Sequence, residues 1–308
     1  MDKLPQALVI VLNWNGLSDT LECLESLSHL DYPAYEVVVV DNGSADGSVS
    51  VIREQLPAIT VIENEENLGY AGGNNVGLRY ALAQKADYAL LLNNDTMVDS
   101  ALLRLLVEAS EANLFVGIVG PTIYYHARPN TIWSAGGAID WKRGSTRMVG
   151  LNEQDVGQFG KKPREVDFVT GCALLVRMKA VETAGELDER FFMYYEETEW
   201  CVRIARAGYR IMHVPQAKMW HKISPEAQVD SPFVRYYMTR NRLLFLKATG
   251  ATMRVWLHTL FAEYLRILIS WSVGPKRRCM RAQRDIMVIA LRDYFSKRLG
   301  KAPIGWKG

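Results

Sequence analysis

Leu90-Leu-Leu-Asn-Asn-Asp-Thr96 is an apolar run that stops abruptly at three polar residues. A strand buried in a sheet ends in this way, and in an open α/β sheet ligands bind beyond the carboxyl ends of the strands. Asp95 at such an end can hold a hard cation, and the cation can hold a diphosphate. A simple turn built from Asn and Asp explains the same residues without any ligand. The rest of the chain has to distinguish these interpretations.

Two other apolar runs end in polar residues in the same way. Ala7–Leu12 precedes Asn13, and Val37–Val40 precedes Asp41. Helical patterns separate the runs, so roughly the first 115 residues have the spacing of βαβ units in a mainly parallel sheet flanked by helices. The carboxyl ends of parallel strands meet at one edge of the sheet, so we expect Asn13, Asp41 and Asp95 to lie together there.

Local patterns around these strands predict a helix start, a glycine turn and a further strand. Asp19 and Glu22 have the spacing of a capping box at the start of a helix. Gly69–Gly73 is read as a glycine turn, which either lets the backbone approach a ligand or simply joins a strand to a helix. Ile118-Val119 is expected to be a short strand that ends before Pro121.

The remainder of the chain is less regular and then helical. Tyr124–Arg164 is expected to be a long excursion containing a hairpin, and such loops often act as lids or binding loops. From Phe233 onward the pattern is wholly helical, with basic residues beside Trp and Leu. That mixture suits an anionic membrane surface, or an ordinary helical hairpin with solvated charges. Val255–Val273 is too polar to span a bilayer, because its interior contains His258, Glu263 and Arg266.

Composition narrows the class of protein. The 308 residues are 49% hydrophobic and 23% charged, as in a globular protein, and a net charge of +2 gives no reason to expect a nucleic-acid partner. The four cysteines form no CxxC pair, so a zinc site and a disulfide framework are not expected. We therefore expect a reducing, cytoplasmic setting, and the first residues do not resemble a signal peptide.

Two groups of residues are candidates for chemistry. Asp95 and His221 are candidate metal ligands, suited to Mg²⁺ or Mn²⁺, although a lone histidine is more often structural. Glu196, Glu197 and Glu199 form an acidic cluster that is either a solvated helix start or the source of a general base. The sequence contains no G-x-G-x-x-G or P-loop motif, which removes the usual support for dinucleotide binding and ATP hydrolysis.

Five stretches together resemble family 2 glycosyltransferases, especially the bacterial rhamnosyltransferase-like branch. The resemblance runs from about Ala7 to Gly250, and Trp220-His221 and Arg240-Asn241 are also in the family's order. The five stretches are Val11-Leu-Asn-Trp-Asn-Gly16, Val39-Val-Asp-Asn-Gly-Ser44, Asn67-Leu-Gly-Tyr-Ala-Gly-Gly-Asn-Asn75, Leu91-Leu-Asn-Asn-Asp-Thr96 and Phe192-Met-Tyr-Tyr-Glu-Glu197.

The resemblance implies a GT-A fold for nucleotide-diphospho-sugar transfer, with a helical C-terminal extension. It implies a catalytic domain over residues 1–232, with a nucleotide-binding half at about 1–115 and an acceptor half at about 116–232, followed by the extension at 233–308. Asp95 and His221 would bind Mn²⁺ or Mg²⁺, and Glu197 would be the catalytic base, with Glu196 or Glu199 as alternatives. The nucleotide would meet Asn13, Asn15, Asp41, Asn67, Asn74 and Asn94, and Arg240 would either hold phosphate or anchor the C-terminal helices.

Two residues depart from the family's pattern. Asn93 replaces the first acid of the Asp-x-Asp motif, and Glu197 stands where the family usually has Asp. The implied function is inverting, metal-dependent transfer from dTDP-rhamnose or a UDP-sugar to a glycan or polyprenyl-diphosphate-linked glycan, at the inner face of the membrane or in the cytoplasm. The alternatives are a nucleotidyltransferase that makes nucleotide-sugars and a non-catalytic binding module. The first should have a Gly-rich basic loop after the first strand, and the second would need neither Asp95 nor the acidic cluster.

Overall fold

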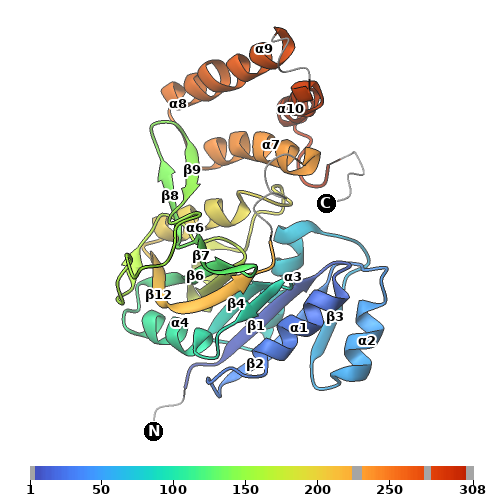
Figure 1. Cartoon of the computed structure of the whole chain (residues 1–308), viewed down its shortest axis with the longest axis vertical. Coiled ribbons are helices and arrows are strands. Elements are labelled where there is room, and N and C mark those ends of the chain that lie inside the picture. Colours follow the sequence, from blue (N-terminus) through green and yellow to red (C-terminus); the bar gives the residue numbers. More distant parts are fainter. Residues whose placement is uncertain (1–3, 224–230, 274–278, 303–308) are drawn as a thin grey trace.

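The computed structural model of the chain describes residues 4–223, 231–273 and 279–302. Its N-terminal half alternates strands and helices as expected (Figure 1). Four parallel strands form this half of the sheet, and β1 lies between β2 and β4. The elements are β1 (Ala7–Asn13), α1 (Leu17–Leu27), β2 (Tyr35–Asp41), α2 (Ser48–Gln55), β3 (Thr60–Glu63), α3 (Gly69–Ala83), β4 (Tyr88–Asn93), β5 (Thr96–Val98) and α4 (Leu102–Glu111).

The second half of the chain extends the same sheet with mixed directions. Within the described residues the strand order is β10-β12-β6-β11-β4-β1-β2-β3, with β5 beside β12 and β7 beside β6. The strand β11 runs antiparallel to both β4 and β6, while β12 runs parallel to β6. The added elements are β6 (Val116–Tyr125), β7 (Arg128–Ser134), β8 (Gly137–Asp140), β9 (Ser145–Met148), β10 (Arg164–Glu165), β11 (Ala173–Arg177), α5 (Met178–Ala184), α6 (Glu196–Arg206) and β12 (Arg210–His221).

The sheet is buried on both faces, as the continuous apolar runs predict. Along β1, Leu8 and Ile10 pack into one hydrophobic cluster, and Val9 and Val11 pack into the other. The first cluster also contains Leu243 from the C-terminal helices, so the core continues from the sheet into that region.

The C-terminal region is helical, as expected, and lies above the sheet in Figure 1. The hairpin β8–β9 rises from the long excursion and meets this region, where the guanidinium of Arg242 donates to the carbonyl of Gly144 at 2.8 Å. No helix in the described ranges is both long and apolar enough to cross a membrane. The elements are α7 (Pro232–Ala248), α8 (Met253–Leu257), the π-helical segment η1 (His258–Leu265), α9 (Arg266–Val273) and α10 (Arg281–Phe295).

The expected capping box at Asp19 and Glu22 is wrong. The helix α1 begins earlier, at Leu17, with Gly16 at its N-cap position, and the carboxylate of Asp46 accepts from the amide of Leu17 at 3.1 Å. The carboxylates of Asp19 and Glu22 instead form ion pairs at 2.8 Å with the ammonium of Lys222, which follows β12. A partner about two hundred positions away could not be read from local spacing.

Two backbone expectations are also wrong. Gly69–Gly73 is not a turn but the first part of α3. The strand expected at Ile118-Val119 is β6, which continues through Pro121 to Tyr125. Proline is tolerated there because the register with β12 shifts immediately after the Val214–Pro121 pair, and a proline within a sheet is usually found at such an irregularity.

Candidate active site

The predicted metal ligands Asp95 and His221 are brought into contact by two strands. Asp95 lies between the end of β4 at Asn93 and the start of β5 at Thr96, and Thr96 pairs with His221 at the end of β12. Nε2 of His221 lies 3.1 Å from both carboxylate oxygens of Asp95. The imidazole is almost fully buried, whereas about a third of the Asp95 side chain is exposed, at 35%. The carboxylate is therefore the open member of the pair.

The surroundings of this pair favour an anionic Asp95. Burial raises the pKa of Asp95, but the hydrogen bond and charge interaction with His221, a backbone hydrogen bond and the charge of Lys222 together lower it more, so the net pKa lies below its ordinary value. The ring of His221 packs edge-on against Trp133 at 4.9 Å between centroids. Its Nδ1 atom is buried without a hydrogen-bond partner among the described residues.

Asn13 and Asp41 lie together, as predicted from the strand ends, and the residue that joins them from the end of β4 is Asn94 rather than Asp95. Nδ2 of Asn13 donates to Asp41 at 2.7 Å, and Nδ2 of Asn94 donates to Oδ1 of Asn13 at 3.1 Å. The sequence argument missed Thr20 and Ser44, whose hydroxyl groups complete the network by bonding to Asn13 and Asp41, respectively. Neither residue lies at a strand end, although Ser44 stands within a stretch that carried the resemblance.

The other predicted nucleotide contacts surround this network. Asn15 has a positive φ of 52°, and its side chain accepts from the amide of Ala45 at 2.7 Å. Oδ1 of Asn67 accepts from the amide of Gly69 at 2.7 Å and so fixes the start of α3. Asn74 is buried in α3, and its Oδ1 has no hydrogen-bond partner within the described structure. Asn15 and Asn67 thus follow the carboxyl ends of β1 and β3 in the chain, and Asn74 lies in the helix α3 that comes after β3.

The acidic cluster lies in the first turn of α6, but it is not solvated. Only 3% of Glu196 and 7% of Glu199 is exposed, and Glu197 is partly buried. The guanidinium of Arg203 binds both carboxylate oxygens of Glu199, at 3.2 Å or less. In contrast, Oε2 of Glu196 and Oε2 of Glu197 are buried without partners in the described ranges. Glu199 is thus engaged by Arg203, whereas Glu196 and Glu197 each keep one oxygen without a partner in the described residues.

Burial changes the protonation of these two acids. It raises the pKa of Glu197 above its ordinary value, against the effect of nearby backbone amides and the Thr198 hydroxyl. Burial, with the added charge of Glu197, raises the pKa of Glu196 well above the ordinary value. Burial therefore raises the pKa of both acids, and the charge of Glu197 adds to the shift of Glu196.

Tyr70 lies within the electrostatic influence of the acidic pair and is hydrogen-bonded to the segment that pairs with the end of β4. Burial raises the pKa of Tyr70 well above its ordinary value, and the charges of Glu196 and Glu197 add to the shift. The Tyr70 hydroxyl donates to the carbonyl of Gly171 at 2.6 Å. The next residue, Cys172, accepts from the amide of Asn93 at 3.0 Å, two positions before Asp95.

The turn that leads into α6 has a strained backbone. Phe192, Tyr194 and Tyr195 have φ values of 67°, 69° and 74°, a region that bulky residues rarely adopt. Such strain is stored at functional sites only where the surroundings hold it in place. Here the amide group of Asn241, from α7, donates at 2.7–2.9 Å to the carbonyls of Phe191, Met193 and Tyr194.

Arg240 supports the same turn, and its predicted phosphate contact does not match its surroundings. The guanidinium is fully buried between the rings of Tyr236 and Tyr237. It donates to the carbonyls of Phe191 and Gly300, at 3.0 and 2.6 Å. A phosphate would have to displace these bonds. The alternative role of anchoring the C-terminal helices fits, although the described partners are carbonyls and hydrogen-bonding side chains rather than a carboxylate.

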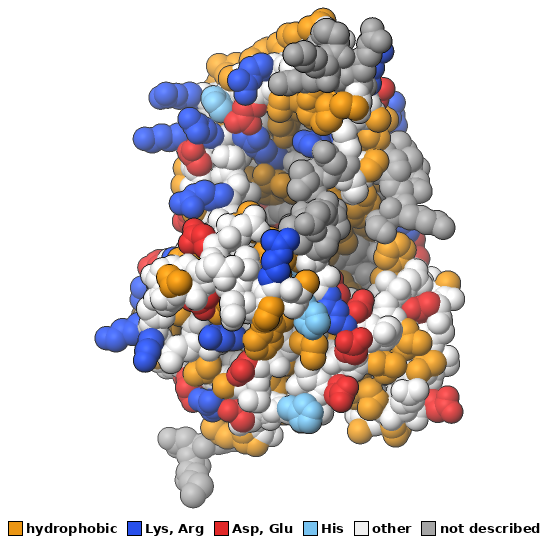
Figure 2. Space-filling view, viewed as in Figure 1, with side chains coloured by type: hydrophobic (Ala, Val, Ile, Leu, Met, Phe, Trp, Pro, Cys, Tyr) orange, Lys and Arg blue, Asp and Glu red, His pale blue; other side chains and the backbone are white. Residues whose placement is uncertain are grey.

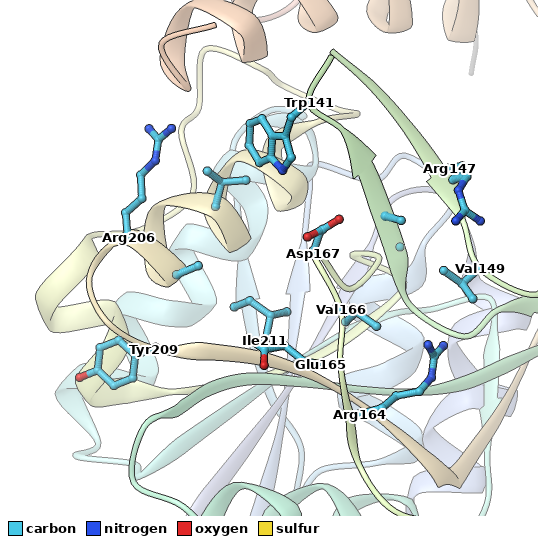
Figure 3. Close-up of a pocket in the computed structure, with 14 residues that line it drawn as sticks. Trp141, Arg147, Val149, Arg164, Glu165, Val166, Asp167, Arg206, Tyr209 and Ile211 are labelled. Carbon is cyan, nitrogen blue, oxygen red and sulfur yellow. The ribbon is translucent and has the colours of Figure 1, made fainter. Parts of the chain in front are cut away.

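A separate pocket of about 790 Å³ is lined by residues from the β8–β9 hairpin, from residues 164–167, from α6 and from the start of β12 (Figure 3). Trp141 and Arg147 project into it from the β8–β9 hairpin, and Arg206 comes from the last turn of α6. None of the predicted site residues lines it, and Asp167 in its wall is occupied by the amide of Ile139 at 2.7 Å. We therefore do not assign the transfer chemistry to this pocket.

Comparison with known proteins identifies the family. The family described as Glycosyl transferase family 2 matches residues 8–185, which is more than half of the chain. The chain belongs to glycosyltransferase family 2. It is 28% identical over 243 residues to a low-salt glycan biosynthesis hexosyltransferase of Haloferax volcanii, an alignment that covers 77% of this chain and 74% of the relative. It is 25% identical to the dTDP-rhamnosyl transferase RfbF of Shigella flexneri, over 68% of this chain and 70% of that protein.

Other relatives and solved structures agree. An N-acetylglucosaminyl-diphospho-decaprenol L-rhamnosyltransferase of Mycobacterium tuberculosis is 27% identical over 64% of this chain and 70% of its own length. A mannosyltransferase from Pyrobaculum calidifontis, solved with GDP-Man and Mn²⁺, superposes with a TM-score of 0.56 at 17% identity, over 96% of this chain and 89% of that one. The expected GT-A fold and rhamnosyltransferase-like branch are confirmed, and the protein is a glycosyltransferase rather than a nucleotidyltransferase or a binding module.

Proposed function

We propose that this glycosyltransferase is inverting and uses a divalent metal to transfer a sugar from a nucleotide diphosphate to an acceptor hydroxyl. The observation that supports this most directly is the Asp95–His221 pair at 3.1 Å, at the same end of the sheet as the Asn13–Asp41 network. A partly exposed carboxylate beside a buried imidazole is a donor set for a cation, and the amide network beside it offers polar groups to a nucleotide.

The residues present fit Mn²⁺ or Mg²⁺ with two protein ligands. Such ions are commonly bound by one or two carboxylates, with water and substrate phosphates completing the shell. This agrees with the finding that residues 4–223, 231–273 and 279–302 contain no group of three or more His, Cys, Asp and Glu side chains suited to a metal. The imidazole of His221 favours Mn²⁺ over Mg²⁺. When bound by Asp95 and His221, the ion would offset the negative charge on the departing nucleoside diphosphate.

In the proposed reaction Glu197 accepts the proton of the acceptor hydroxyl. That oxygen forms a bond to the anomeric carbon as the bond between this carbon and the diphosphate oxygen breaks, and the diphosphate leaves with the electron pair. A single direct displacement inverts the anomeric configuration. The raised pKa of Glu197 brings the base closer to neutral pH, where a general base is most effective. Because the pKa of Glu196 is raised well above its ordinary value, we assign the role of base to Glu197 rather than to Glu196.

The names of the relatives support a donor and an acceptor class. One relative is a dTDP-rhamnosyl transferase, and another acts on an N-acetylglucosaminyl-diphospho-decaprenol. We therefore propose dTDP-rhamnose or a UDP-sugar as the donor, and a glycan or a polyprenyl-diphosphate-linked glycan as the acceptor. A polyprenyl acceptor would bring the protein to the inner face of the cell membrane.

Calorimetry of nucleotide binding tests the donor site. We expect UDP or dTDP, rather than GDP, to bind with Mn²⁺ present and to lose most of its affinity in EDTA. Asp95→Asn should remove the metal dependence, while Asp99→Asn, a nearby acid outside the proposed site, should not. Binding that is unaffected by EDTA would contradict the metal site, and transfer that retains the anomeric configuration would contradict direct displacement.

A further inference from the structure

One face of the C-terminal helices carries a row of exposed apolar side chains. Its members recur at every fourth position through α8, η1 and α9, and each is between 43% and 75% exposed. We call this row the apolar stripe. It consists of Met253, Leu257, Phe261, Leu265, Ile269 and Val273.

The π-helical segment keeps this stripe on one face. In an α-helix with 3.6 residues per turn, each step of four residues drifts by about 40° around the axis, so a row of six would wind around the helix. In η1 the i→i+5 bonding widens the turn, and the drift of a four-residue step is reversed. The steps from Leu257 to Leu265 therefore reverse the angular drift that the α-helical steps on either side add.

The stripe is not needed to pack the helices. The opposite face of the same helices is already buried, through Val255, Thr259, Tyr264 and Trp271. The Tyr264 hydroxyl donates to a carbonyl of α7 at 3.2 Å. An exposed row of large apolar side chains on a helix that is already packed marks a contact with something outside the chain.

The charge of the chain is divided between its two parts. Residues 231–308 contain 16 of the 36 Lys and Arg residues but only 3 of the 34 Asp and Glu residues, so their formal charge is +13, whereas residues 1–230 have −11. The net charge of +2 hides this asymmetry. A part of a protein that is both basic and apolar on its surface complements an anionic membrane.

The charges next to the stripe have the same sign. Arg254 and Arg266 on its helices, and Arg281 on α10, are exposed and have no ion-pair partner among the described residues. Glu263 is the only acid between positions 253 and 273, and it is turned inward to an ion pair with Arg242. Figure 2 shows hydrophobic side chains along the top of the molecule, where α9 lies in Figure 1, with Lys and Arg side chains at the upper left.

We propose that the apolar stripe lies in the interfacial region of an anionic phospholipid membrane, with Arg254, Arg266 and Arg281 against the headgroups. Only the purpose of this membrane contact, which is to hold the active site above a lipid-linked acceptor, rests on the proposed function. The contact itself depends on the stripe and the charge, so it is testable without any donor or acceptor.

Vesicle flotation of the purified full-length protein tests this contact. We expect the protein to float with vesicles that contain phosphatidylglycerol, to bind phosphatidylcholine vesicles much less, and to be released by high salt. The triple variant Leu257→Ser, Phe261→Ser, Ile269→Ser should lose flotation. The double variant Arg254→Glu, Arg266→Glu should weaken it by more than about tenfold.

Matched variants elsewhere on the surface act as controls. Leu114 and Phe115 are exposed to 71% and 67% between α4 and β6, and Leu114→Ser with Phe115→Ser should leave flotation unchanged. Lys161→Glu with Lys162→Glu is the control for charge. Circular dichroism shows whether each variant is folded. Nucleotide binding shows whether the proposed donor site fails independently of the membrane contact.

Three results would overturn the proposal. The first is a wild-type protein that binds neither type of vesicle, and the second is a triple variant that floats as well as the wild type. The third is a wild-type protein that forms a dimer in analytical ultracentrifugation, does not float, and becomes monomeric in the triple variant. In that case the stripe is a surface for a second copy of this chain.

Discussion

At the scale of single residues, Glu196 and Glu197 show how one helix turn can raise the pKa of two neighbouring carboxyl groups to different extents. Glu196 is buried and Glu197 is partly buried, and both have a buried oxygen without a hydrogen-bond partner in the described structure. The charge of Glu197 adds to the burial of Glu196, so that the pKa of Glu196 is raised well above its ordinary value. Two neighbouring acids whose pKa values are pushed apart can act as an acid that stays protonated and a base.

Glu197→Gln should lower the rate of transfer by about 10²–10⁴-fold, the usual contribution of a general base, without weakening nucleotide binding. Because the base must be deprotonated and burial raises its pKa, the wild-type rate should fall as the pH drops through a value above the ordinary range for glutamate. A pH–rate profile of the donor-saturated enzyme measures this. Full turnover in Glu197→Gln would transfer the role of base to Glu196.

Glu196→Gln should stabilise the protein at neutral pH. A carboxyl group whose pKa is raised by folding is protonated in both states at low pH, where burial has no electrostatic cost. As the pH rises above the pKa of the unfolded chain, ionisation favours the unfolded state, and stability is lost until the pH reaches the raised pKa of the folded protein. Glutamine avoids this loss. The melting temperature of the variant should exceed that of the wild type at pH 7, by a margin that shrinks toward pH 4. A constant margin would contradict the raised pKa.

At the scale of elements, the turn before α6 depends on helix α7, which follows it by about forty positions in sequence. Three neighbouring carbonyls of this turn accept from one amide, that of Asn241, and two accept from Arg240. Gly69, at the start of α3, packs against Phe192 of this turn. Its φ is +75°, and a Cβ atom there would lie 2.5 Å from the carbonyl oxygen of Phe192. Glycine at this position therefore allows the backbone of α3 to approach this turn closely, rather than to approach a ligand.

Asn241→Ala should misplace the Glu196–Glu197 pair as well as destabilise the fold. Each buried carbonyl left unpaired costs about 1–3 kcal/mol, so we expect a marked drop in melting temperature. Nucleotide binding should persist, because Asn241 does not touch the Asp95–His221 pair, while the rate falls and its acid limb shifts.

Asn75→Ala is the matched control for this variant. Asn75 is equally buried and donates to the carbonyl of Leu187 at 2.9 Å, in the same connection between α5 and α6 but four positions before Phe191. We expect a similar loss of melting temperature with an unchanged pH–rate profile. If both variants change the profile alike, Asn241 is structural only and does not position the acids.

At the scale of the whole molecule, the strands of the sheet could be predicted because their signals are local. Apolar runs ending in Asn13, Asp41 and Asp95 indicated both the strands and their common edge. The partners of Lys222, Asn241 and Arg240 could not be predicted, since each contact joins positions about fifty or more apart in sequence. The resemblance showed that Arg240-Asn241 stands in the family's order, but it did not show what the two residues do. Their buried guanidinium and amide groups bind backbone carbonyls, and because every sequence has these carbonyls, they give no sequence signal.

The same contacts indicate that the division at residue 232 does not separate two independent folding units. The main hydrophobic cluster contains Trp200 and Ile204 of α6 together with Phe245 of α7 and Trp271 of α9. Arg240 joins the tail at Gly300 to the turn before α6. Differential scanning calorimetry should therefore show one unfolding transition for the full-length protein, with equal calorimetric and van't Hoff enthalpies, and Asn241→Ala should move the whole transition to lower temperature. Two separate transitions, of which Asn241→Ala moves only one, would mean that the C-terminal helices unfold by themselves and that the strained turn can survive without them.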